Sequence, residues 1–258
     1  MGAKTVKLPR PAEPNIRRVL DEFLDEQRTT LAPRTLARYE NVLDLLRSHL
    51  DGYAHECLSA PEAARFERSY DAEGEEHREF CDLFGPEKIV ENLGGFLCDF
   101  MIRKVLAGED LLRAAGTVTK KLSKWLGGKG YVSLEDAGQA SERSAAAARD
   151  LPRAQRSAQI LREAAERLGI DAAALDDRDY LEFDRFTIAK VEPGRLWLNG
   201  WDDGKPRTRG PIPVPEPATR WLRPGWTISC SLGCVRKSWR LLEVANVYPD
   251  AMLLAVPR

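Results

Sequence analysis

The spacing of apolar residues predicts that the first half of the chain is a bundle of helices. Apolar side chains recur every three or four positions over residues 16–27, 33–50, 86–107 and 109–126, the pattern of helices with one buried face. Residues 86–107 are apolar around most of the predicted helix, so this helix is expected at the centre of the bundle. Glycines at 127, 128 and 130 are expected to end the last helix, because glycine readily takes the left-handed conformation found at helix C-termini.

The pattern changes after residue 133. Residues 133–150 are small, polar and rich in alanine, and they predict a domain boundary. Residues 151–168 carry apolar residues on one side only and predict a solvated helix, either a connector or the start of a second domain. From about Tyr180, shorter apolar segments are separated by turn signals at 192–194 and 202–204, which predicts four or five short strands.

These elements predict an α+β protein, with an N-terminal all-α helical bundle followed by a small C-terminal β-barrel. The barrel is expected to be closed or nearly closed, of the Src-homology or oligonucleotide-binding kind. The predicted division is a disordered arm at 1–14, a helical domain at 15–134, an alanine-rich helical linker at 135–178 and the barrel at 179–258.

Composition indicates the class of protein. A hydrophobic content of 43% and a charged content of 31% exclude wholesale disorder. No apolar run approaches the roughly 18 residues of a membrane helix. The N-terminal stretch lacks the apolar core of a secretory signal, so a soluble, cytoplasmic protein is expected. Five cysteines are an odd number, which favours reduced thiols.

Charge is distributed unevenly along this chain, whose formal net charge is −1. Residues 101–134 include seven basic and two acidic residues, a local charge of +5. Residues 205–240 include eight basic and one acidic residue, a local charge of +7, and tryptophans stand at 201, 221, 226 and 239. Basic side chains beside aromatic ones suit phosphates and stacked bases. Two plainer alternatives stay open: the basic helix face is merely solvated, and most of these tryptophans fill a core while one is exposed.

Two stretches resemble a known family. Residues 31–50 read LAPRTLARYENVLDLLRSHL, with matches at Thr35, Tyr39, Leu43 and Leu46. They resemble the second helix of the SAM-like core-binding domain of tyrosine recombinases and phage integrases. Residues 116–132 read GTVTKKLSKWLGGKGYV and are similar to the last helix of that domain, with matches at Thr117, Lys120, Lys121, Trp125, Leu126, Gly130 and Val132. The resemblance covers residues 15–134 and implies a helical domain that contacts DNA.

The resemblance does not extend to a catalytic domain. Those enzymes need an arginine pair, a lysine, histidines and a tyrosine nucleophile in a second domain, whereas the three histidines here, His49, His55 and His77, all precede residue 80. Residues 15–134 hold 17 basic and 21 acidic residues, a balance of −4, so only part of that surface is expected to face phosphate. The resemblance therefore implies DNA contact without strand transfer.

Other chemistry finds little support in the residue pattern. Cys230 and Cys234 have no neighbouring histidine and are expected to be small buried hydrophobes rather than metal ligands. The aspartates between 171 and 179 lack the glycine and final glutamate of a calcium loop. There is also no nucleophile elbow, phosphate-binding loop or dinucleotide motif. We expect no catalysis, no metal and no cofactor.

The sequence thus predicts a non-enzymatic nucleic-acid-binding protein that contacts mainly the phosphate backbone, with DNA favoured over RNA. The alternative is a protein–protein adaptor with no nucleic-acid role, and an enzyme is a third possibility that no residue set supports. The predicted contact residues lie on the basic helix, near the start of the second helix and on the barrel loops: Arg34, Arg38, Arg103, Lys104, Thr117, Lys120, Lys121, Lys124, Lys129, Lys205, Arg207, Arg209, Arg236 and Lys237.

Overall fold

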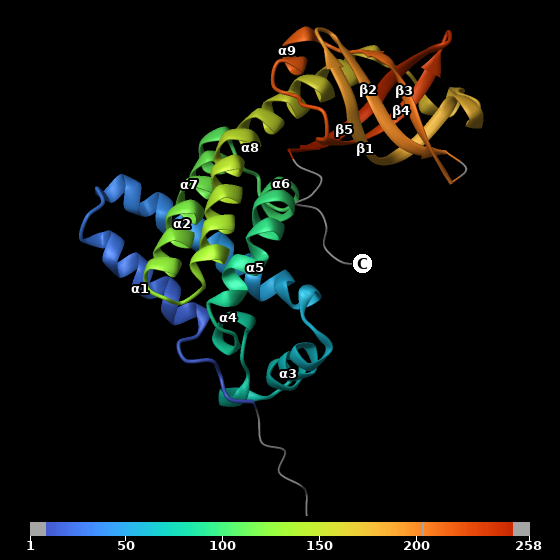
Figure 1. Cartoon of the computed structure of the whole chain (residues 1–258). Helices are drawn as coiled ribbons and strands as arrows, with labels where there is room; N and C mark the ends of the chain where they lie inside the picture. Colours follow the sequence, from blue (N-terminus) through green and yellow to red (C-terminus); the bar gives the residue numbers. More distant parts are fainter. Residues whose placement is uncertain (1–8, 203, 250–258) are drawn as a thin grey trace, which may run out of the picture. The chain divides into compact units, whose positions relative to one another are not determined.

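The computed structural model describes residues 9–202 and 204–249, and it is an α+β structure with helices followed by an antiparallel sheet (Figure 1). The chain forms two compact units. The first contains the residues up to Leu97 together with Ala114–Ala146. The second contains Cys98–Arg113 and the chain from Ala147 onward. The three boundaries in the described ranges fall inside helical segments, namely the π-helical turn Phe96–Phe100, α7 (Glu109–Gly128) and α8 (Leu134–Leu168).

The first unit begins with the two helices that the apolar spacing predicts, α1 (Ile16–Arg28) and α2 (Pro33–Tyr53). The side chain of Asn15 caps α1 by accepting a hydrogen bond from the backbone N–H of Arg18. Pro33 occupies the first turn of α2, where its missing N–H costs no helical hydrogen bond. Two helices follow, α3 (Ala60–Tyr70) and the short α4 (Phe80–Leu83). The fully buried core of this unit includes Phe23, Leu43, Leu46, Phe80, Ile89 and Leu93.

The prediction of a helix over residues 86–107 is confirmed for residues 87–103, which are helical without a break but include a π-helical turn that the spacing did not indicate. The segment consists of α5 (Glu87–Gly95), a π-helical turn (Phe96–Phe100) and α6 (Met101–Arg103). The helix changes at the glycine pair 94–95, where the imidazole of His49 lies 3.4 Å from the position that a Cβ of Gly95 would take. Because glycine weakens a helix interior, the regular α-helix is less favoured at this point, and the His49 ring packs into the space that a side chain at position 95 would fill. The expected burial is present, because most residues of this segment are buried.

Helix α8 runs through the alanine-rich segment after residue 133 without a break, and one boundary between the two units lies inside that segment, between Ala146 and Ala147. Alanine has the highest helix propensity, and the hydroxyl of Ser133 caps the first turn by accepting from the N–H of Asp136. Small residues also let α7 and α8 approach closely in the first unit. A Cβ on Gly127 would lie only 2.6 Å from that of Ala137.

The second unit is built on an antiparallel sheet of five strands in the order β3-β2-β1-β4-β5. The strands are β1 (Tyr180–Glu192), β2 (Arg195–Asp202), β3 (Lys205–Pro213), β4 (Thr227–Val235) and β5 (Ser238–Tyr248), with the short helix α9 (Glu216–Thr219) before β4. The two predicted turn signals join β1 to β2 and β2 to β3. Its core combines strand residues with the second half of α8, including Phe186, Ile188, Leu198, Ile228, Leu232, Val244, Ala158 and Leu161.

The prediction of a closed barrel is wrong. In the described part of the chain no hydrogen-bonded ladder joins the edge strands β3 and β5. Prolines at 206, 211 and 213 leave β3 with too few N–H donors for a second ladder, which confines it to an edge. Side chains meet between the two edges instead, since the guanidinium carbon of Arg209 lies 5.6 Å from the ring centre of Trp239.

Within the described residues, no helix combines the length and the apolar character needed to cross a membrane.

Candidate nucleic-acid interface

Helix α7 separates a buried apolar side from an exposed basic side. Ala115, Val118, Leu122 and Leu126 are at most 1% exposed. Thr119 and Ser123 share this buried side, and each satisfies its hydroxyl by donating to the carbonyl oxygen four residues earlier. The helical period therefore turns the intervening lysines outward. We call Lys120, Lys121 and Lys124 the α7 lysine face.

The α7 lysine face has no compensating carboxylate. In the described part of the chain, no carboxylate oxygen lies within 4.0 Å of any of its three ammonium groups. The ammonium of Lys121 lies 5.7 Å from the ring centre of Tyr39 on α2. Lys120 and Lys124 line a hollow of about 470 Å³ against the first turns of α8, where Glu142 is the one acidic lining residue. The face therefore presents positive charge to solvent.

Lys129, just beyond the end of α7, is in a different situation. Its ammonium lies 2.5 Å from a carboxylate oxygen of Glu26 and 3.1 Å from one of Glu22. The indole N–H of Trp125 donates to Glu26 and the hydroxyl of Tyr131 donates to Glu22. We call these five residues the Lys129 clamp. Hydrogen bonds from Tyr131 and Lys129 lower the pKa of Glu22, and those from Lys129 and Trp125 lower the pKa of Glu26.

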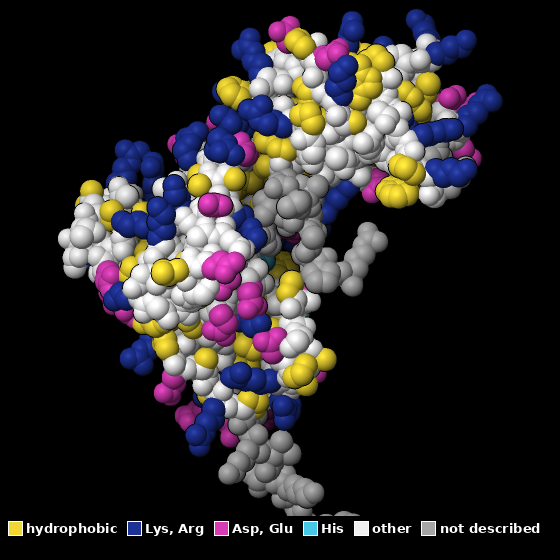
Figure 2. Space-filling view, in the orientation of Figure 1, with side chains coloured by type: hydrophobic (Ala, Val, Ile, Leu, Met, Phe, Trp, Pro, Cys, Tyr) yellow, Lys and Arg dark blue, Asp and Glu magenta, His cyan; other side chains and the backbone are white. Residues whose placement is uncertain are grey.

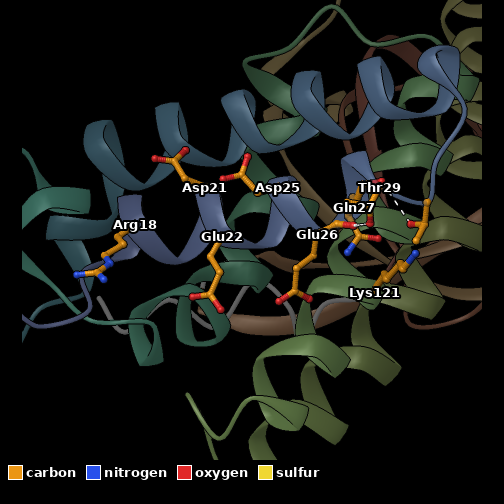
Figure 3. A pocket seen from close by; sticks show the side chains of 9 residues that line it. Arg18, Asp21, Glu22, Asp25, Glu26, Gln27, Thr29 and Lys121 are labelled. Atoms are coloured by element: carbon orange, nitrogen blue, oxygen red, sulfur yellow. Dashed lines mark hydrogen bonds between the residues drawn. The ribbon is translucent and has the colours of Figure 1, made fainter.

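The acidic side of the clamp belongs to a larger hollow along α1, of about 970 Å³ (Figure 3). Asp21 and Asp25 point to one side of α1, and Glu22 and Glu26 point to the other. Asp21 is paired with Arg47 at 2.5 Å and Asp25 with Arg28 at 2.6 Å. All four carboxylates thus have a cation of the chain's own. This arrangement was not among the features predicted from the sequence, although an acidic pair repeated four positions apart on one helix indicates an acidic stripe.

The other predicted contacts of the helical half fall into two groups. Arg34 and Arg38 are exposed and lie one turn apart near the start of α2. Tyr39 of the same helix contacts Lys121. Thr117 is exposed on α7. Arg103 and Lys104 belong to the second unit instead. The guanidinium of Arg103 donates to the carboxylate of Asp99 at 3.1 Å. The structure therefore does not place all the basic residues of 101–134 in one unit.

In the second unit, four predicted residues lie at one end of the sheet. Lys205 and Arg207 are exposed where β3 begins, and Arg236 and Lys237 form the turn between β4 and β5. Both hairpins turn at the same end, because β2 and β4 each run antiparallel to β1. Figure 2 shows Lys and Arg side chains around this end, with acidic side chains among them.

Arg209 differs from these four residues. It is only 4% exposed, and its guanidinium lies over Trp239 inside the unit. The four tryptophans fit the alternative in which most of them pack inside the domain and one is exposed. Trp226 is buried, Trp221 and Trp239 are half-buried, and Trp201 is 71% exposed. Arg209 is thus a residue of the core, at a position where the sequence pattern indicates an exposed charge.

The described residues contain no group of three or more His, Cys, Asp or Glu side chains that could hold a metal ion. Cys230 is fully buried in the sheet core, and burial raises the pKa of its thiol. Its environment is that of a small hydrophobe.

Comparison with protein-family models, with curated proteins and with solved structures gives no match. The resemblance to the core-binding domain of tyrosine recombinases stays a prediction.

Proposed function

We propose that this protein binds nucleic acid, with duplex DNA preferred to RNA, through phosphate contacts made by the α7 lysine face. The observation that carries the proposal is the uncompensated charge of Lys120, Lys121 and Lys124. Other cations of the first unit are held by carboxylates, in the pairs Arg17–Asp82, Arg28–Asp25, Arg47–Asp21, Lys88–Glu62 and Lys129–Glu26. Ammonium groups without a carboxylate at ion-pair distance are the ones that gain most by contacting phosphate.

The proposed contact is electrostatic and does not read the base sequence. Each ammonium that neutralises a phosphate releases condensed counterions, and on duplex DNA the logarithm of the binding constant falls by about 0.9 per contact for each tenfold rise in salt. Three contacts correspond to a slope of about −2.7. Arg34 and Arg38 on α2 would extend the contact and steepen the slope.

The resemblance to the recombinase core-binding domain supports DNA as the partner, because Thr117, Lys120 and Lys121 belong to the matching stretch. The proposal covers DNA contact alone and includes no strand transfer. In the second unit, Lys205, Arg207, Arg236 and Lys237 are proposed as additional phosphate contacts at one end of the sheet. Arg209 is left out, because its guanidinium is buried.

A protein–protein adaptor is the second candidate, and the acid-lined hollow of α1 is the feature that favours it. A basic segment of another protein would complement its four carboxylates. Such a partner would have to displace Arg28, Arg47 and Lys129, which already neutralise those carboxylates. Lys121 also lines that hollow, but among the described residues no carboxylate oxygen lies within 4.0 Å of an ammonium of the lysine face, so nucleic-acid binding is the stronger proposal.

The test is fluorescence anisotropy with labelled duplex DNA and single-stranded RNA over a series of salt concentrations. The variant K120Q/K121Q/K124Q is expected to weaken DNA binding at least tenfold at low salt and to flatten the salt dependence. The control R68Q/R167Q/R178Q removes the same charge from exposed arginines whose side chains make only local contacts. This control is expected to bind DNA with an affinity within about twofold of that of the unchanged protein.

Absence of DNA binding at low salt would refute the proposal. Equal weakening of DNA binding by the two variants would show that only total charge matters, and the lysine face would no longer be the proposed contact surface.

A further inference from the structure

The second unit contains a hollow of about 290 Å³ that is lined mainly by arginines. None of them is among the predicted contact residues. They come from the start of α7 and from the middle of α8: Arg113, Arg149, Arg153 and Arg156. Trp221, which follows α9, and Glu109 complete the polar and aromatic lining. This volume is near the lower limit of ligand-binding pockets.

Helical spacing explains why the arginines converge. Residues 149, 153 and 156 are separated by four and then three positions, so they lie on one face of α8. The guanidinium of Arg156 lies 3.5 Å from the carboxylate of Glu109, which ties the first turn of α7 to this face. Figure 2 shows Lys and Arg side chains gathered where α7 begins and α8 passes. The cluster is a product of helix pairing within one unit.

The arginines are only partly compensated. Asp150 is 13% exposed and serves two of them, accepting from Nε and Nη2 of Arg149 at 3.0 and 2.7 Å and from Nη1 of Arg153 at 3.2 Å. Arg113 has Asp110 at 3.3 Å. Arg149, Arg153 and Arg156 thus share two carboxylates among the described residues, Asp150 and Glu109, and a guanidinium carries five N–H donors. Donors remain on Arg149, Arg153 and Arg156 for an added acceptor.

The cluster is also held in position. Asp150 binds Arg149 through two parallel hydrogen bonds, which fixes the plane of that guanidinium. The guanidinium carbon of Arg153 lies 5.6 Å from the ring centre of Trp221, so stacking orients a second one. Fixed guanidinium groups lose little freedom on binding, and their fork geometry matches the oxygen atoms of a phosphate.

We propose that this arginine hollow is a binding site for a phosphate group. A phosphate monoester carries more charge than a carboxylate and has three terminal acceptor oxygens, and a phosphodiester has two; both suit several guanidinium groups that share too few carboxylates. Trp221 at the rim provides an aromatic surface for a nucleoside attached to that phosphate. The phosphate comes either from a free nucleotide or from the backbone of a nucleic acid. The site shares no residue with the α7 lysine face and does not depend on it.

Isothermal titration calorimetry on the full chain at low salt tests the site with inorganic phosphate, adenosine 5′-monophosphate, adenosine and a short oligonucleotide. In the variant R149Q/R156Q, Asp150 loses Arg149 but keeps its pair with Arg153, and the half-exposed Glu109 loses Arg156. The control R167Q/R178Q removes two exposed arginines of the same unit. We expect R149Q/R156Q to weaken phosphate-dependent binding at least tenfold and the control to change it less than twofold.

Comparison of the ligands in this experiment identifies the source of the phosphate. Binding of the monophosphate but not of adenosine, lost in R149Q/R156Q, supports a free nucleotide. Binding of the oligonucleotide alone, retained in K120Q/K121Q/K124Q and lost in R149Q/R156Q, supports a nucleic-acid backbone and separates this site from the lysine face. If R149Q/R156Q does not fold, the single variant R156Q is used in its place, after thermal unfolding has shown that R156Q is folded. The proposal is overturned if neither phosphate compound nor the oligonucleotide binds, or if variant and control bind equally.

Discussion

Lys124 and Lys129 are little more than one helical turn apart, yet their charges are in opposite situations. Lys124 is exposed on α7 with no carboxylate oxygen within 4.0 Å among the described residues, whereas Lys129 lies between Glu22 and Glu26. A count along the chain treats the two residues alike. The comparison teaches that the charge available to a partner depends on which acidic residues the fold brings to each lysine.

Lys88 gives a second example of a compensated lysine. Its ammonium lies 2.8 Å from carboxylate oxygens of both Glu62 and Glu91, and its side chain is 11% exposed. Like the Lys129 clamp, this group joins elements that are distant in the sequence, here α3 and α5. Lys88 and Lys129 therefore connect helices, whereas Lys120, Lys121 and Lys124 have no carboxylate at ion-pair distance among the described residues.

The largest expected effect contrasts the two sides of α7. Leu122→Ala should lower the free energy of unfolding by about 2–5 kcal/mol, because Leu122 is fully buried and the substitution leaves a cavity. Lys124→Ala should change it by less than about 0.5 kcal/mol. Urea denaturation of both variants measures the difference. Similar losses would mean that Lys124 has a structural role.

Next in size is the difference between the two lysines in DNA binding. Lys124→Gln should weaken binding several-fold and reduce the slope of the salt dependence by about 0.9, the contribution of one phosphate contact. Lys129→Gln should leave both quantities nearly unchanged, because its charge is already neutralised by Glu22 and Glu26. Anisotropy titrations at several salt concentrations compare them. A larger effect at Lys129 would reverse the assignment of the binding face.

A smaller effect concerns acid stability at Lys88. Its ammonium and the hydroxyl of Ser59 lower the pKa of Glu62 from 4.5 to about 2 in the folded protein. The unfolded chain therefore takes up this proton first, and the contribution of the pair is present above pH 4.5 and is lost as the pH falls toward 2. Because Glu62 is 33% exposed, solvent screens the pair and we expect only about 1 kcal/mol.

Denaturation of Glu62→Gln at pH 7 and at pH 3 tests this pair. The variant should be less stable than the natural chain at pH 7, and the difference should shrink at pH 3. A constant difference at both pH values would indicate a cause other than the ion pair.

The smallest effect lies within the Lys129 clamp. Tyr131→Phe removes the hydroxyl that makes the largest contribution to lowering the pKa of Glu22, so that pKa should rise toward 4.5. The pKa of Glu26, which depends on Lys129 and Trp125, should stay low. Carboxyl chemical shifts followed by NMR report both residues in one titration. An equal rise at both would show that the clamp acts as one unit rather than through separate hydrogen bonds.

Local signals predicted most of the fold correctly. The starts of α1 and α2 and the turns that join β1, β2 and β3 depend on neighbouring residues: the polar cap Asn15, Pro33 and the glycines at 194 and 204. Residues 133–150 were predicted to hold a domain boundary, and one boundary between the two units lies there, between Ala146 and Ala147, inside the continuous helix α8. The sheet was misjudged because strand number does not determine whether the edge strands pair.

The positions of the basic residues, the apolar side of α7 and the strand turns follow from the sequence alone, since they depend on periodicity and on a few residues in contact along the chain. Which lysines are compensated, that Arg209 is buried over Trp239, and that four arginines line one hollow became known only from the folded chain. The physical reason is that electrostatic and packing energies depend on distances in space, and Glu22 and Lys129 come within 3.1 Å only after the helices have packed.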